Sequence, residues 1–112
     1  MEEEYTKYGE YINYPGESFS QALPRKDNAV WDDSATGDWK LVDNTGSVVI
    51  SGNCTFDIDR LNMIFMIGKS NTVGLFGIYK LLVYVTDNIN SEINYVIVDY
   101  KMDYRKILAR ND

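Results

Sequence analysis

Residues 78–86 are Ile-Tyr-Lys-Leu-Leu-Val-Tyr-Val-Thr, and this stretch decides the fold class. Its side chains alternate with a period of two, which is typical of a β-strand with two different faces. The face expected to point into a core carries Tyr79, Leu81, Val83 and Val85. The opposite face carries Leu82 and Tyr84, which we expect on the outside of the sheet. The stretch therefore predicts a long strand in an all-β protein.

The rest of the chain shows the same alternation between turn residues. Residues 38–43 and 47–51 flank Asn44-Thr45-Gly46, which predicts a hairpin. The stretch 55–59 alternates, and residues 93–104 alternate again over a longer distance. Two weaker strand candidates, 8–14 and 18–23, end at prolines, and the continuous apolar run 63–67 predicts a buried strand. The expected core residues are Trp39, Leu41, Phe56, Ile58, Tyr79, Leu81, Val83, Val96 and Val98.

No segment shows a sustained helical period with caps at its ends. Short strands separated by turn signals predict an all-β fold, an antiparallel β-sandwich of about seven strands. The length of 112 residues suits a single domain. We expect an N-terminal arm or edge strand at 1–15, the sandwich at 16–107 and a tail at 108–112.

Composition excludes several classes of function. The net charge is −6, with 17 acidic against 11 basic residues, which argues against binding to nucleic acid or to an anionic membrane. The chain has no histidine and one cysteine, Cys54, so zinc sites and Ser-His or Cys-His nucleophiles lack their raw material. We therefore expect no cofactor, no metal and no enzyme activity. The acidic start, Met1-Glu2-Glu3-Glu4, does not resemble a secretory signal, and we expect a protein that is made and kept in the cytoplasm.

Two short motifs resemble sites of chemistry. Gly68-Lys69-Ser70 resembles the end of a phosphate-binding loop, but Met63 stands where that motif requires glycine. Asp57 and Asp59 would share one face of a strand and could hold a cation or act as an acid and base. Their alternation with apolar neighbours favours a solvated strand face instead.

Large apolar side chains on outward positions predict a protein interface. If the strands at 78–86 and 93–104 pair, their outward side chains form one apolar patch, and such patches mark interaction sites. Tyrosines near the N-terminus could dock as an arm on a neighbouring subunit or simply pack against the sandwich. A loop or the arm could also cover the patch. The candidate interface residues are Leu82, Tyr84, Tyr95, Ile97, Tyr5, Tyr8 and Tyr11.

The order of these features resembles a known family. It runs from a Gly-Glu turn at 15–19, through the strand and turn at 39–48 and the motif Gly77-Ile-Tyr-Lys-Leu-Leu-Val-Tyr-Val-Thr-Asp87, to a final strand at 95–104. This order is similar to the small immunoglobulin-like β-sandwich domains of tailed-bacteriophage virion proteins. The resemblance implies a structural component of the head, neck or baseplate, located in the virion. Its partners would be other virion proteins or copies of itself, in an oligomer or a larger assembly.

The sequence is also compatible with a second function. Carbohydrate-binding β-sandwich modules attach to cell surfaces by stacking sugar rings on exposed aromatic side chains. Trp31, in a polar loop between two strand candidates, could serve this purpose if it is exposed. The chain could then be a cell-surface attachment module rather than an assembly component.

Overall fold

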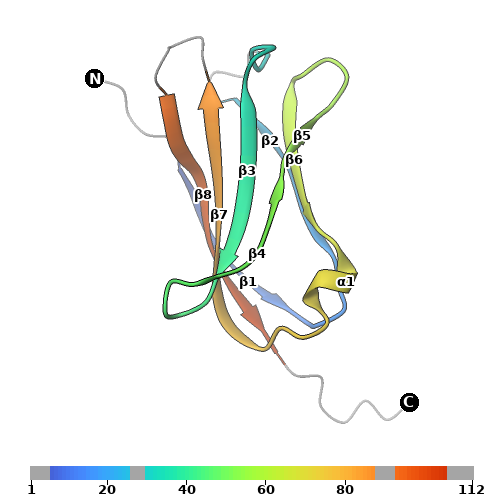
Figure 1. Cartoon of the computed structure of the whole chain (residues 1–112). Helices are drawn as coiled ribbons and strands as arrows, with labels where there is room; N and C mark the ends of the chain where they lie inside the picture. Colours follow the sequence, from blue (N-terminus) through green and yellow to red (C-terminus); the bar gives the residue numbers. More distant parts are fainter. Residues whose placement is uncertain (1–5, 26–29, 88–92, 106–112) are drawn as a thin grey trace.

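The computed structural model describes residues 6–25, 30–87 and 93–105, apart from the side chains of 87 and 93–96. Two β-sheets face each other, and a single helical turn lies at one end (Figure 1). The elements are β1 (Lys7–Asn13), β2 (Phe19–Pro24), β3 (Thr36–Val42), β4 (Val48–Asn53), β5 (Thr55–Phe56), β6 (Asn62–Ile67), α1 (Lys69–Thr72), β7 (Gly77–Asp87) and β8 (Ile93–Tyr104).

The larger sheet has five strands in the order β1-β8-β7-β3-β4, and the smaller has three in the order β2-β6-β5. Neighbouring strands run antiparallel except at one edge, where β1 lies parallel to β8 and Lys7 pairs with Val98. The fully antiparallel arrangement expected from the sequence is therefore wrong at this edge. The reason is that the first strand joins the sheet beside the last one instead of pairing with its own neighbour in the chain.

The strand order is that of an immunoglobulin-like sandwich. β8, β7, β3 and β4 follow the G-F-C-C′ order of such domains, and β2, β6 and β5 follow the B-E-D order. Trp39 on β3 is buried, as is the tryptophan on strand C of immunoglobulin domains. The expected all-β, immunoglobulin-like sandwich is thus confirmed, with eight strands among the described residues.

The core lies between the sheets and follows the expected alternation on β3 and β7. Phe56 is half-buried and Ile58 is 98% exposed, so the expected core position of Ile58 is wrong. The reason is that β5 ends at Phe56 and the chain then turns back over 57–61. Tyr79 is half-buried and packs against the core, and the side chain of Val96 lies outside the described residues. The expected residues that are buried in the core are Trp39, Leu41, Leu81, Val83 and Val98.

The apolar run 63–67 forms most of β6 but is buried on only one face. Met63, Phe65 and Ile67 point into the core, whereas Met66 is 57% exposed and Ile64 is half-buried. The reason is that β6 is the middle strand of a three-stranded sheet whose outer side carries no other strand of the described chain. The continuous apolar sequence of 63–67 therefore belongs to a strand with only one face in the core.

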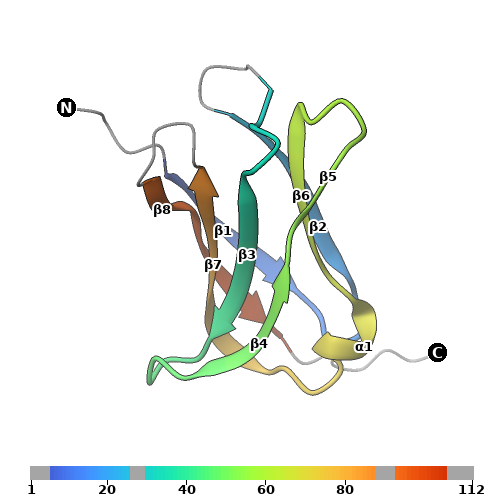
Figure 2. The same ribbon diagram turned by 45° about the horizontal axis from the view of Figure 1, so that its top comes forward.

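The chain changes sheets between β4 and β5. β4 is the outer strand of the large sheet, and after Cys54 the same extended segment continues as β5 at the edge of the small sheet (Figure 2). Gly52 lies under the indole of Trp39, where a Cβ would come within 2.7 Å of the ring. The crossing thus closes one side of the sandwich over the tryptophan.

Candidate functional site

The outer side of the large sheet brings three expected interface residues together. Leu82 on β7 lies opposite Asp99 on β8, and Asp99 lies opposite Tyr8 on β1, so these side chains form one row across the sheet. Tyr84 lies two residues further along β7 on the same side. Leu82 and Tyr84 are half-buried, and Tyr8 is 75% exposed. We call this surface, with Tyr8, Leu82 and Tyr84 at its centre, the outer sheet face.

Ile97 does not belong to this surface, and its expected outward position is wrong. The pairing between β7 and β8 shifts by one residue, because Val83 lies opposite Val98 while Tyr84 lies opposite Val96. Ile97 is the extra residue of this bulge, and both Ile97 and Val98 are fully buried. A bulge inserts one residue and so breaks the alternation of faces along a strand.

Tyr11 is likewise turned inward. Its ring lies 5.1 Å from that of Phe19 and 4.8 Å from that of Tyr100, and its hydroxyl accepts a hydrogen bond from Gln21 Nε2 at 3.2 Å. Tyr11 therefore closes the sandwich between β1 and β2 and does not form part of an arm. Tyr5 lies outside the described residues, and so does the side chain of Tyr95.

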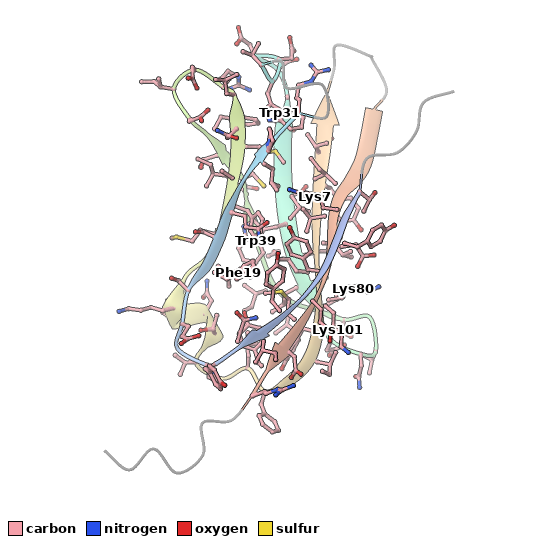
Figure 3. All side chains as sticks on the ribbon, turned by 180° about the vertical axis from the view of Figure 1, so that it is seen from behind. Lys7, Phe19, Trp31, Trp39, Lys80 and Lys101 are labelled. Atoms are coloured by element: carbon pink, nitrogen blue, oxygen red, sulfur yellow. The ribbon has the colours of Figure 1, made fainter. Side chains whose placement is uncertain are left out.

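Charged side chains of both signs lie within and around the outer sheet face, and Asp99 stands between Tyr8 and Leu82. Lys80 Nζ lies 3.4 Å from Asp99 Oδ1, and Lys101 Nζ lies 3.4 Å from Glu10 Oε2. Exposed pairs of this kind contribute little to stability, typically about 0–1 kcal/mol. Figure 3 shows Lys80 and Lys101 on the outer side of the large sheet, away from the side chains that fill the core. The face is therefore a mixed surface, neither strongly basic nor strongly acidic.

A cation packs on the tyrosine at the centre of this face. The ammonium of Lys40 lies 4.9 Å from the ring centroid of Tyr84, within range of a cation–π interaction. Lys40 therefore lies over one face of the Tyr84 ring, which is half-buried. Two further apolar side chains border the same surface, Ile12 at 53% and Ile78 at 47% exposure.

An open hollow of about 680 Å³ lies at one end of the outer sheet face. Tyr8 and Ile78 supply apolar lining, and Asn44, Asp99 and Lys101 supply polar groups. Four different strands and the turn after β3 contribute to it, so it depends on the assembled sheet rather than on one motif. Nothing in the local sequence around any of these residues marks the hollow.

Trp31 is not available for stacking on a sugar, so the expectation of an exposed tryptophan is wrong. It is 1% exposed, and its indole Nε1 donates a hydrogen bond of 3.1 Å to the carbonyl of Leu23. Arg60 holds the surrounding loop, because its guanidinium donates to the carbonyls of Trp31, Asp32 and Ala35. The loop is polar in sequence but folds its tryptophan into the end of the core.

Asp57 and Asp59 belong to the turn between β5 and β6. The carboxylate of Asp57 accepts hydrogen bonds from the backbone N and the side-chain Nδ2 of Asn62, at 3.0 and 2.9 Å. These bonds, first that from the backbone, hold the pKa of Asp57 below its ordinary value. Asp59 Oδ1 accepts from the backbone N of Leu61 at 3.3 Å. Both carboxylates thus have structural partners in the turn.

The other candidate sites in the sequence have simple structural roles. Gly68 precedes α1, a single turn that spans Lys69–Thr72. Cys54 is half-buried where the chain changes sheets, and burial raises the pKa of its thiol to about 12. Within residues 6–25, 30–87 and 93–105, no three His, Cys, Asp or Glu side chains lie close enough to hold a metal ion. In the same part of the chain, no helix is long and apolar enough to cross a membrane.

Comparison with known proteins finds distant structural likenesses. No family model matches the chain, and no curated protein matches it either. Among solved structures, the fibronectin(III)-like modules of Clostridium thermocellum CbhA share 12% identity at a TM-score of 0.49, covering 90% of this chain and 92% of that one. CopC from Methylosinus trichosporium OB3b shares 10% identity at a TM-score of 0.44, covering 79% of this chain and 99% of that one.

Proposed function

We propose that this chain is a non-catalytic structural module that docks onto another protein subunit through the outer sheet face. The observation that carries the proposal is the placement of Tyr8, Leu82 and Tyr84 on one side of the large sheet. No strand or helix of the described chain lies over that side. Exposed apolar patches rimmed by polar groups are typical of protein interaction sites.

The composition of the outer sheet face fits a protein partner better than other macromolecules. Tyrosine is enriched at protein interfaces because it combines a large apolar ring with a hydroxyl that can stay hydrated. Lys80 and Lys101 are each paired with a carboxylate, so this face offers no stripe of free cations to phosphates. The charges that stand among the apolar side chains of this face are paired with one another.

The assembly we propose is the virion of a tailed bacteriophage, with this chain in the head, neck or baseplate. This part of the proposal rests on the sequence resemblance together with the immunoglobulin-like strand order. The partners would be other virion proteins or further copies of the chain. The protein would be made in the host cytoplasm and retained in the particle.

The test is incorporation of a tagged chain into particles during infection. The double variant Tyr8→Glu/Tyr84→Glu places two charges on the outer sheet face and should be lost from purified particles while remaining folded. Met66→Glu, on the outer side of the small sheet, is the matched control and should be incorporated like the wild type. If the double variant is incorporated normally, the docking surface lies elsewhere. If the wild-type chain is absent from particles, the proposed assembly is wrong.

Carbohydrate binding remains the second candidate, and it now rests on Tyr8 instead of Trp31. Tyr8 is exposed beside the open hollow, whose polar lining includes Asn44 and Asp99. An exposed ring can stack on a sugar, and the neighbouring amide and carboxylate oxygens can accept hydrogen bonds from the sugar hydroxyls. A glycan array that shows binding by the wild type, and none by Tyr8→Ala, would favour this function over docking.

A further inference from the structure

β4 forms an edge of the large sheet that carries no charge. Residues 44–56 contain no Asp, Glu, Lys or Arg, although the whole chain has a net charge of −6. Val48 and Val49 on this strand are 53% and 42% exposed. Exposed uncharged edge strands pair readily with other chains, and natural proteins normally block them with charges, prolines or bulges. β4 has one of these protective features, a bulge at Val49, and residues 50–53 pair with β3 without interruption.

The other long edges differ from β4 in this respect. β1 carries Lys7 and Glu10, and β2 ends at Pro24. Charged side chains and proline are the usual means of keeping a sheet edge from pairing. Among the described strands, β4 is therefore the long edge least protected against pairing with another strand.

Along β4, the backbone N–H and C=O groups of successive residues point alternately towards β3 and towards the open edge of the sheet. The backbone N of Cys54 donates to the carbonyl of Gly37 at 2.9 Å, which makes these two a hydrogen-bonded pair. In an antiparallel ladder such pairs occur at every second residue. The groups of Gly52 and Ile50 therefore point to β3, and those of Ser51 and Asn53 point away from the sheet. No strand of the described chain pairs with that side.

We propose that β4 pairs antiparallel with β4 of a second copy of this chain, about a two-fold axis at Ser51. Two large sheets would then join into one continuous sheet across the dimer. The pairing places Ser51 opposite its own counterpart and Ile50 opposite Gly52 of the other copy. Ile50 is half-buried, and the bare glycine leaves space for its side chain across the new pair.

A second copy is the occupant that the charge distribution favours. Two molecules with the same net charge of −6 repel each other, and β4 is a place where they can meet without setting like charges opposite one another. A two-fold interface uses the same patch on both subunits, so an uncharged strand is complementary to itself. The antiparallel direction also follows from the two-fold symmetry.

The expected dimer is weak. β4 has six residues, and pairing one short strand buries less than the roughly 1,000 Å² that a stable interface needs. The association should therefore depend on concentration, and it would be strengthened wherever other contacts hold two copies close together. The outer sheet face stays uncovered in this dimer, so the inference does not depend on the proposed docking function.

The experiment is sedimentation equilibrium over a range of concentrations, with far-UV circular dichroism to check folding. The wild type should show a monomer–dimer equilibrium. Ser51→Lys and Ser51→Glu each set like charges across the two-fold axis, and each should weaken the dimer about tenfold or more. An equimolar mixture of the two variants should restore dimerisation, because opposite charges then face each other. Met66→Lys and Tyr84→Glu, which lie on other surfaces, should dimerise like the wild type.

Amide hydrogen exchange of the wild type tests the same pairing without any variant. The amides of Ser51 and Asn53 should exchange more slowly at high than at low protein concentration. A chain that stays monomeric at all concentrations would overturn the proposal. So would a dimer that both Ser51 variants leave unchanged, or one in which the mixture gives no recovery. Loss of the dimer in Tyr84→Glu alone would instead place the contact on the outer sheet face.

Discussion

Gly52→Ala should destabilise the protein, although replacing a glycine in a strand usually has the opposite effect. A Cβ on Gly52 would lie 2.7 Å from Cζ2 of Trp39 and 2.8 Å from both Cε2 and Nε1. These atoms belong to a rigid ring, and Trp39 is only 4% exposed, so the indole has little room to move away. Either β4 must shift outward or the tryptophan must leave its position in the core.

The magnitude follows from two opposing effects. Overpacking a well-packed core by one methyl group costs about 1–3 kcal/mol. The lower chain entropy of alanine in the unfolded state returns about 0.4–1 kcal/mol. We expect a net loss of about 1–2 kcal/mol in the free energy of unfolding, which for a domain near this size lowers Tm by roughly 5–10 °C. Urea unfolding followed by far-UV circular dichroism measures the change.

Gly74→Ala is the matched control, because a Cβ there would meet no atom within 4 Å. Its stability should equal that of the wild type or exceed it slightly. A second test repeats Gly52→Ala in a Trp39→Phe background, where the smaller ring should reduce the cost of the added methyl group. A Gly52→Ala protein as stable as the wild type would refute the reasoning, and an equal cost in both backgrounds would show that the indole is not the cause.

Three further predictions concern single side chains. Arg60→Ala should lower the free energy of unfolding by about 1–3 kcal/mol, because its guanidinium donates hydrogen bonds to backbone carbonyls in the segment 31–35, and thermal unfolding would measure the loss. Tyr104→Phe should leave stability unchanged or higher, because the Tyr104 hydroxyl is buried and has no hydrogen-bond partner among the described residues; a clear loss in urea unfolding would contradict this. Cys54 should react with a thiol reagent at pH 8 far more slowly than free cysteine, because burial, and secondarily the charge of Asp38, raise the pKa of its thiol to about 12. Since the folded state holds this proton more tightly, the stability that Cys54 contributes should be present below pH 9.0 and be lost as the pH rises towards about 12. Fast labelling of the native protein by the thiol reagent would contradict the raised pKa.

The alternation along β7 allowed its two faces to be assigned from the sequence. Leu81, Val83 and Val85 are fully buried, while Leu82 and Tyr84 lie on the outside. This strand has a neighbour on each side and one face on the core, so a single parity holds along its whole length. The same reasoning failed at 55–59, where the alternating stretch is too short to distinguish a strand from a turn closed by Asp57 and Asn62.

The positions of Tyr11 and Trp31 show where local pattern carries no information. Tyr11 faces inward because Phe19 and Tyr100 supply aromatic partners from two other strands. Trp31 is buried because the loop around it is held by Arg60, which lies 29 residues further along the chain. Neither contact leaves a signal in the residues immediately around the tyrosine or the tryptophan, because the partners come from distant parts of the sequence.

The sequence by itself determined the all-β class, the sandwich and the inward and outward sides of β3 and β7, because a period of two follows from the geometry of an extended chain. The tertiary structure alone decided which outward candidates form a surface. The bulge that buries Ile97 arises from the pairing of β7 with β8, and the row of Tyr8 and Leu82 exists because β1 lies parallel to β8. Pairing register and sheet order are set by contacts between distant segments, and side-chain alternation within one strand does not encode them.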